Sequence, residues 1–276
     1  MDIRFTKMHG LGNDFVVINA IDQKICLTNE QVKFIANRNT GIGCDQLLLV
    51  EKSDNKNADF RYRIFNNDGS EVEHCGNGAR CFAKFVHAEG LTDKTEIPVV
   101  THNGLIKLQL TPDGNVTVDM GAPVLKPEDI PFKADIQQTT YDITIDGKII
   151  TFGAISMGNP HAVILVDDVA NHDIEKTAKA IQAHEDFPNS VNVGFMQIID
   201  SSHVKLRVYE RGVGETLACG TGACAAVVAG RLQERLDDTV ETQLLGGNLS
   251  IHWAGDQNPV MMTGPASTVF EGKLSL

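Results

Sequence analysis

Two cysteines stand at the start of closely similar Gly-rich turns, one in each half of the chain. The first turn reads Cys75-Gly76-Asn77-Gly78-Ala79-Arg80-Cys81, and the second reads Cys219-Gly220-Thr221-Gly222-Ala223-Cys224. Where such a turn opens a helix, unpaired backbone N–H groups and the helix dipole favour a thiolate over a thiol. The same N–H groups can bind a carboxylate. Each turn therefore predicts an acid/base group beside an anion site.

Two copies of this turn predict a pair of acid/base groups acting on one carbon. One thiolate would remove a proton next to a carboxylate, and the opposite thiol would deliver another proton to the other face. Hydrogen bonds aimed at the developing enediolate would compensate for the weak acidity of that carbon. The residues alone thus predict a racemase or epimerase of an amino or imino acid. Two alternatives stay open: a proline-racemase-like enzyme, and a redox protein in which Cys75 and Cys219 form a switchable disulfide.

The duplication extends beyond the cysteine turns. Polar residues recur in the same order at an offset of about 145 positions, as in Asn13 and Asn159, Gln46 and Asn192, and Asn66 and Glu210. A repeat this long indicates two domains rather than a solenoid, whose units span roughly 20–50 residues. We expect an N-terminal half made of residues 1–119 plus 263–276, and a C-terminal half made of residues 120–262.

The order of predicted elements indicates the fold. Short alternating stretches predict strands in both halves, and two helices interrupt them in each half, at about 28–36, 78–89, 173–183 and 222–236. Residues 223–230 are apolar on every side, so we expect that helix to be buried all round. A buried helix within a mostly antiparallel sheet implies a sheet curled around it. We therefore predict an α+β fold of two pseudo-symmetric domains, each a mostly antiparallel β barrel wrapped around a central α-helix.

Composition excludes several function classes. The net charge of −12 and the lack of a basic patch argue against a nucleic-acid partner. No apolar run approaches the ~20 residues of a membrane span, and no signal peptide is visible, so we expect no membrane partner and a cytoplasmic protein. The spacing of the six cysteines is poor for zinc, and we expect no metal. Dinucleotide and P-loop motifs are missing. A lysine that holds pyridoxal phosphate stays open, although no Lys lies in a motif.

Motifs throughout the chain carry a family resemblance. They are residues 8–15 (MHGLGNDF), 41–46 (GIGCDQ), 66–70 (NNDGS), 73–81 (EHCGNGARC), 158–161 (GNPH), 210–216 (ERGVGET) and 218–222 (ACGTG). With these motifs the chain resembles, over essentially its whole length, the diaminopimelate epimerases. These cofactor-independent enzymes interconvert LL- and meso-diaminopimelate, in lysine and peptidoglycan precursor biosynthesis.

The resemblance implies a role for individual residues. Cys75 and Cys219 would be the acid/base pair, and His161 and Glu210 resemble the pair that tunes the cysteines. The implied substrate contacts are Asn13, Gln46, Asn66, Gly76, Asn77, Asn159, Asn192, Glu210, Arg211, Gly220 and Thr221. No cofactor is implied, and the small-molecule substrate would be diaminopimelate. A homodimer is also implied, with Phe270 at the place of a tyrosine linked to dimerisation in relatives.

Overall fold

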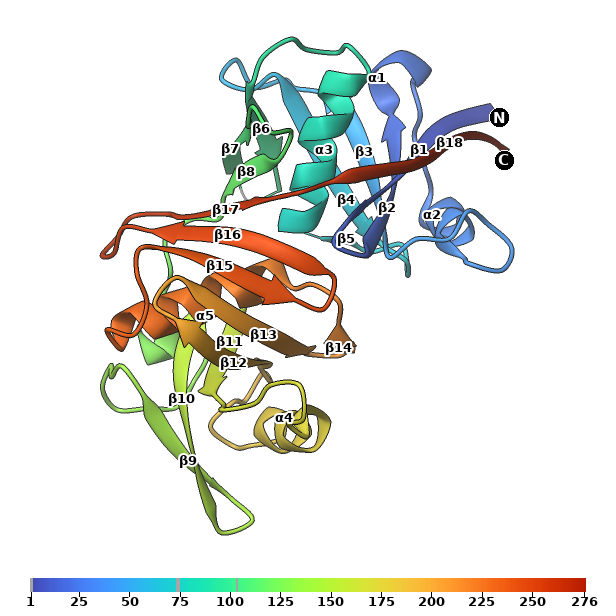
Figure 1. The fold of residues 1–276 in the computed structure, drawn as a ribbon. Coiled ribbons are helices and arrows are strands. Elements are labelled where there is room, and N and C mark those ends of the chain that lie inside the picture. Colours follow the sequence, from blue (N-terminus) through green and yellow to red (C-terminus); the bar gives the residue numbers. More distant parts are fainter. Residues whose placement is uncertain (1, 73–74, 103) are drawn as a thin grey trace. The chain divides into compact units, whose positions relative to one another are not determined.

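The computed structural model describes residues 2–72, 75–102 and 104–276 (Figure 1). The chain divides into two compact units, one of Met1–Asp119 with Thr263–Leu276 and the other of Met120–Met262. The chain leaves the first unit after β8 (Val116–Asp119) and returns to it within β17 (Val260–Gly264). Among the described residues, no helix has the length and apolar character that crossing a bilayer requires.

The first unit is one mixed sheet that holds a helix. Its neighbouring strands follow the order β18–β1–β2–β3–β4–β6–β7–β8, with β5 paired to β4. Only β2–β3 and β4–β6 among these described pairs are parallel. The elements are β1 (Asp2–Gly10), β2 (Asn13–Asn19), α1 (Ala20–Gln23), α2 (Asn29–Ala36), β3 (Gln46–Lys52), β4 (Phe60–Asn66), β5 (Glu71–Val72), α3 (Gly76–Ala88), β6 (Glu96–Thr101), β7 (Gly104–Leu110), β8 and β18 (Ser267–Ser275).

The second unit repeats this connectivity. Its strands follow the order β9–β10–β11–β12–β13–β15–β16, with β14 paired to β13, and β11–β12 and β13–β15 are parallel. The elements are η1 (Pro127–Asp129), β9 (Tyr141–Ile145), β10 (Lys148–Ser156), β11 (Pro160–Leu165), α4 (Ile174–Gln182), β12 (Asn192–Asp200), β13 (His203–Glu210), β14 (Gly214–Thr216), α5 (Gly220–Leu232), β15 (Thr239–Leu244) and β16 (Gly247–Trp253).

Each unit wraps its strands around one helix. In the first unit α3 packs against β1, β2, β3, β7 and β8, and in the second α5 packs against β10, β11, β12, β13 and β16. All residues of α5 from Gly222 to Gly230 are buried, which is why the run carries no polar side chain. Figure 1 shows α3 lying along the strands of its unit. The predicted α+β fold with a central helix in each half is confirmed.

Local sequence signals account for the helix ends. Thr28 caps α2 in a capping box: its side chain accepts from the N–H of Gln31, and the Gln31 side chain accepts from the N–H of Thr28. Asp173 caps α4 by accepting from the N–H of Lys176. Cys26 is exposed, because it lies in the irregular segment between α1 and α2.

Candidate active site

Both cysteines occupy the N-cap of the central helix of their unit. Cys75 precedes α3 and Cys219 precedes α5, each with extended backbone geometry. The first helical hydrogen bonds run from the N–H of Ala79 to the Cys75 carbonyl (2.8 Å) and from the N–H of Ala223 to the Cys219 carbonyl (2.9 Å). Each sulfur atom therefore belongs to the turn whose N–H groups lack intrahelical acceptors. This is the position that the Gly-rich turns predicted.

Gly78 leaves room for a tyrosine beneath the first turn of α3. A Cβ atom at position 78 would lie 2.6 Å from the Tyr62 hydroxyl and 3.2 Å from Phe15. That hydroxyl donates to the Cys75 carbonyl at 3.2 Å, and the Tyr62 ring packs edge-to-face on Phe82. The glycine thus permits the contact that anchors Cys75 to β4. Sequence reasoning missed Tyr62, which lies outside every motif.

Cys75 is half-buried and faces an asparagine pair. Its Sγ lies 3.7 Å from Asn13 Oδ1, and Asn77 Nδ2 donates to the same oxygen at 3.2 Å. Gln46 and Asn66 are partners across β3 and β4, and Gln46 Nε2 donates to Asn66 Oδ1 at 3.0 Å. Glu73 and His74 of the same motif lie outside the described residues.

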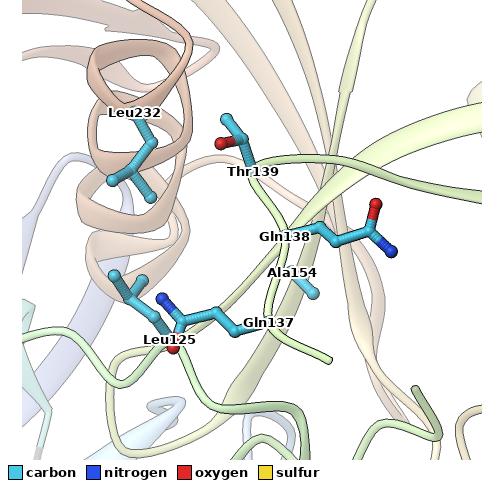
Figure 2. Close-up of a pocket in the computed structure, with 6 residues that line it drawn as sticks. All are labelled: Leu125, Gln137, Gln138, Thr139, Ala154 and Leu232. Carbon is cyan, nitrogen blue, oxygen red and sulfur yellow. The ribbon is translucent and has the colours of Figure 1, made fainter. Parts of the chain in front are cut away.

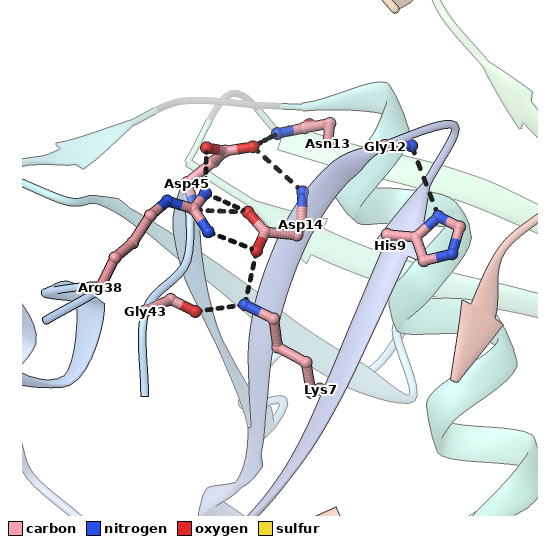
Figure 3. A network of polar contacts seen from close by, with 8 residues as sticks. All are labelled: Lys7, His9, Gly12, Asn13, Asp14, Arg38, Gly43 and Asp45. Atoms are coloured by element: carbon pink, nitrogen blue, oxygen red, sulfur yellow. Dashed lines mark hydrogen bonds and ion pairs between the residues drawn. The ribbon is translucent and has the colours of Figure 1, made fainter. Parts of the chain in front are cut away.

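A charged network lies directly behind Asn13 (Figure 3). Arg38 donates to both carboxylate oxygens of Asp14, at 3.0 and 2.7 Å, and to Asp45 Oδ1 at 2.7 Å. Lys7 forms an ion pair with Asp14 at 2.6 Å and also donates to the Gly43 carbonyl. Burial alone would raise the pKa of Asp14, but the hydrogen bonds from Arg38 and Lys7 outweigh it and hold that pKa well below its usual range.

Cys219 is buried beside an acidic group. Its side chain lies 3.6 Å from Thr221 Oγ1, and the residue is 5% exposed. Burial and the negative charge of Glu210 raise the pKa of Cys219 well above its usual value, and hydrogen bonds from Thr221 and the Gly222 N–H lower it only in part. The expectation that the helix end makes a thiolate is therefore wrong for Cys219, because desolvation opposes the charged form. The raised pKa favours the protonated thiol of Cys219 at neutral pH.

Polar groups around the second turn are held by one another. Asn192 Nδ2 donates to the Pro160 carbonyl at 3.1 Å, and the Arg211 N–H donates to Asn192 Oδ1 at 2.9 Å. The Arg211 guanidinium donates to the Asn189 carbonyl at 2.7 Å. Thr216 donates to Glu210 Oε1 at 2.5 Å, which fixes the carboxylate that acts on Cys219.

His161 is neutral and almost fully enclosed. It is 1% exposed, its Nε2 contacts Asn159 Oδ1 at 3.1 Å, and its Nδ1 has no hydrogen-bond partner among the described residues. Burial, with a smaller effect of the Arg211 charge, lowers the pKa of His161 to about 3. On β11 and β12, His161 pairs with Asn192, so the implied tuning residue adjoins an implied substrate contact.

A pocket in the second unit is separate from these residues. Leu125, Gln137, Gln138, Thr139, Ala154 and Leu232 line it (Figure 2). Leu232 ends α5, whereas Cys219 precedes its start, so this pocket lies by the opposite end of the helix. Within residues 2–72, 75–102 and 104–276, no group of three or more His, Cys, Asp or Glu side chains is placed to hold a metal ion.

Comparisons with known proteins agree with the motifs. The family model described as diaminopimelate epimerase matches residues 5–126 and 153–269. A diaminopimelate epimerase of Thioalkalivibrio sulfidiphilus is 59% identical over 278 residues, and one of Teredinibacter turnerae is 58% identical over 276 residues, each covering 100% of both chains. The solved structure of a Bacillus anthracis phenazine biosynthesis protein, PhzF family, shares the fold with a TM-score of 0.71 at 17% identity, covering 100% of both chains. The chain therefore belongs to the diaminopimelate epimerase family.

Proposed function

We propose that this protein inverts one α-carbon of LL-2,6-diaminopimelate to give meso-diaminopimelate, without a cofactor. One observation carries the proposal: equivalent cysteines cap the central helices of both units in a chain whose relatives at 54–59% identity are named diaminopimelate epimerases. The family match favours this reaction over the proline-racemase-like and redox alternatives.

The two cysteines divide the proton transfer between them. Because burial and Glu210 keep Cys219 protonated, Cys219 enters the cycle as the proton donor. Cys75 is then the thiolate that removes the α-proton, and the two roles exchange in the reverse reaction. In each unit the N–H groups of the helix end, at Gly76 and Asn77 in the first and at Gly220 and Thr221 in the second, offer donors for a carboxylate and for the enediolate that develops on it.

The remaining polar residues select a substrate with a second amino-acid head. Gln46, Asn66, Asn159 and Asn192 offer amide donors and acceptors, and Glu210 and Arg211 offer charges for an ammonium and a carboxylate group. A small ring such as proline carries no second ammonium and carboxylate group to match the charges of Glu210 and Arg211. Sites built around such hydrogen bonds reject the substrate that lacks them by roughly 10⁴-fold or more.

A substrate panel tests this proposal. LL-diaminopimelate, lysine, glutamate and proline are each incubated with reduced enzyme and resolved by chiral chromatography, with a Cys75→Ser variant as the matched control. We expect meso-diaminopimelate from the first substrate only, and none from the control. Comparable inversion of proline or lysine would reduce the assignment to a broad amino-acid racemase.

We also propose that the protein is a cytoplasmic homodimer. Val269 and Phe270 on β18 are exposed apolar side chains (55% and 47%), and Phe270 packs edge-to-face on Phe5. Reactive thiols are also best kept in a reducing compartment. Sedimentation should report a dimer that Phe270→Lys weakens, and cell fractionation should recover the protein with cytosolic enzymes. A wild-type monomer, or recovery outside the cytosol, would contradict these statements.

A further inference from the structure

We propose that Asp45 is a positioning residue, which fixes the Asn13 side-chain amide so that its oxygen faces the Cys75 thiol. The inference deepens the proposed function, because it concerns how one of the two acid/base cysteines is tuned. Asp45 acts on Cys75 through Asn13, which contacts both residues.

A chain of hydrogen bonds determines which way the amides point. Arg80 Nη2 donates to Asn77 Oδ1 at 3.0 Å, Asn77 Nδ2 donates to Asn13 Oδ1 at 3.2 Å, and Asn13 Nδ2 donates to Asp45 Oδ2 at 3.0 Å. An arginine can only donate, and an ionised carboxylate can only accept. With a pure donor at one end and a pure acceptor at the other, both amides have one satisfactory orientation. The oxygen of Asn13 is therefore the atom 3.7 Å from Cys75 Sγ.

Both ends of this chain are rigidly held. Arg80 is fully buried (0% exposed) and also donates to the Pro265 carbonyl at 3.1 Å. At the other end, Asp45 Oδ2 accepts from the Asp14 N–H at 3.1 Å, and Asp14 Oδ1 accepts from the Asp45 N–H at 2.9 Å. Arg38 bridges the two carboxylates, as Figure 3 shows. The aspartates thus clamp each other across the start of β2 and β3.

The second unit lacks this arrangement. At the repeat offset, Val191 replaces Asp45 and Pro160 replaces Asp14, and both are buried and carry no charge. Asn159, the counterpart of Asn13, directs its oxygen to His161 Nε2 instead. The asparagine is thus present in both units, but a carboxylate at this repeat position accepts a hydrogen bond from it only in the first unit. Cys219 has Glu210 as its charged neighbour.

An acceptor facing a thiol favours the protonated sulfur. The Asn13 oxygen therefore makes Cys75 a stronger base, which suits the residue that must take a proton from a weakly acidic carbon. Tyr62 of β4 and Cys81 of α3 are among the described titratable groups that act on this sulfur, and both stay uncharged because burial raises their pKa values. The charges of Lys7, Asp14, Arg38 and Asp45 act from beyond Asn13.

The test measures the pH midpoint of Cys75 alkylation by iodoacetamide, followed by peptide mass spectrometry, in the full-length protein without substrate. In Asp45→Ala only the Asn77 donor still holds the Asn13 amide, so a fraction of the molecules turn the Asn13 NH₂ toward the sulfur. We expect the midpoint to fall by about 0.5–1 pH unit, the size of one ordinary hydrogen bond. Asp45→Asn retains an acceptor oxygen but no charge, and it should shift the midpoint by less than half as much.

Lys94→Ala is the matched control, because it removes an ion pair of the same unit, with Asp59, that is not part of the chain of hydrogen bonds from Arg80 to Asp45. It should leave the midpoint unchanged. An unchanged midpoint in Asp45→Ala would overturn the inference, and equal shifts in Asp45→Ala and Asp45→Asn would replace it with a simple charge effect. If Asp45→Ala speeds the alkylation of both Cys75 and buried Cys81 without changing the midpoint, Asp45 only stabilises the folded unit and does not position Asn13. Since no substrate is used, failure of the epimerase assignment would not alter this readout.

Discussion

Gly78 provides a quantitative test of the packing beneath Cys75. In Gly78→Ala the new methyl group would lie 2.6 Å from the Tyr62 hydroxyl, well inside contact distance, while Phe15 at 3.2 Å and Ile64 at 3.4 Å need smaller adjustments. Overpacking of this kind costs about 1–3 kcal/mol, and the helix preference of Ala over Gly offsets up to about 1 kcal/mol. We expect a net loss of about 1–2 kcal/mol in the free energy of unfolding.

Tyr62→Phe removes the atom that the methyl group would meet. Alone, it should cost about 1 kcal/mol, because the Cys75 carbonyl loses its donor. Adding Gly78→Ala to Tyr62→Phe should then cost close to nothing, which gives a coupling energy of about 1–2 kcal/mol between the two positions.

Urea unfolding of the four proteins, followed by circular dichroism, measures this coupling. The Phe side chain keeps the edge-to-face contact with Phe82, so the double variant controls for loss of the ring packing. Equal costs of Gly78→Ala with and without the Tyr62 hydroxyl would refute the reasoning. A stabilising Gly78→Ala in the otherwise unchanged protein would refute it as well.

Three further predictions address the titrating groups. Cys75→Ser and Cys219→Ser should each lower kcat by about 10²–10⁴-fold while the circular dichroism spectrum stays unchanged, because a hydroxyl is a far weaker acid than a thiol; near-normal turnover by either variant would rule out two-thiol chemistry. Glu210→Gln should speed Cys219 alkylation at pH 7, since the Glu210 charge raises the pKa of that thiol, and an unchanged rate would show that burial alone sets it. In the folded protein the pKa of buried His161 is lowered to about 3, so this residue stays neutral at pH values where it is already protonated in the unfolded chain. The free energy of unfolding should therefore fall by about 1.4 kcal/mol per pH unit from about pH 6.5 downward. His161→Gln should flatten that acid limb in urea titrations, and parallel pH curves would contradict the assignment.

The fold could be predicted because each half repeats a simple pattern. The apolar run in α5 required a helix buried on all sides, and the antiparallel strands around it left a curled sheet as the consistent arrangement. The short elements β5 and α1 escaped prediction, since they span only Glu71–Val72 and Ala20–Gln23 and carry too few residues for periodicity. The family resemblance drawn from the motifs is confirmed by the family match over both halves.

The site could be predicted only in its outline. The N-cap positions of Cys75 and Cys219 follow from the Gly-rich turns, but the protonation of Cys219 depends on burial that the sequence does not express. Asp45 and Arg80 lie inside the motifs, yet their support of Asn13 depends on side chains that meet from distant parts of the chain. The available signal for Arg80 was its place between Ala79 and Cys81 in the first turns of α3, on the stretch that leads into apolar Phe82 and Ala83.

The most direct test of the central claim is a time course of deuterium uptake in deuterated water with LL-diaminopimelate as substrate. If two thiols share the reaction, the proton that one cysteine removes differs from the one that the other returns. Meso-diaminopimelate should then carry one deuterium at its inverted carbon from the earliest time points, while the recovered LL-substrate gains deuterium slowly. Product that forms without deuterium, or substrate that exchanges rapidly without inversion, would contradict the two-cysteine account.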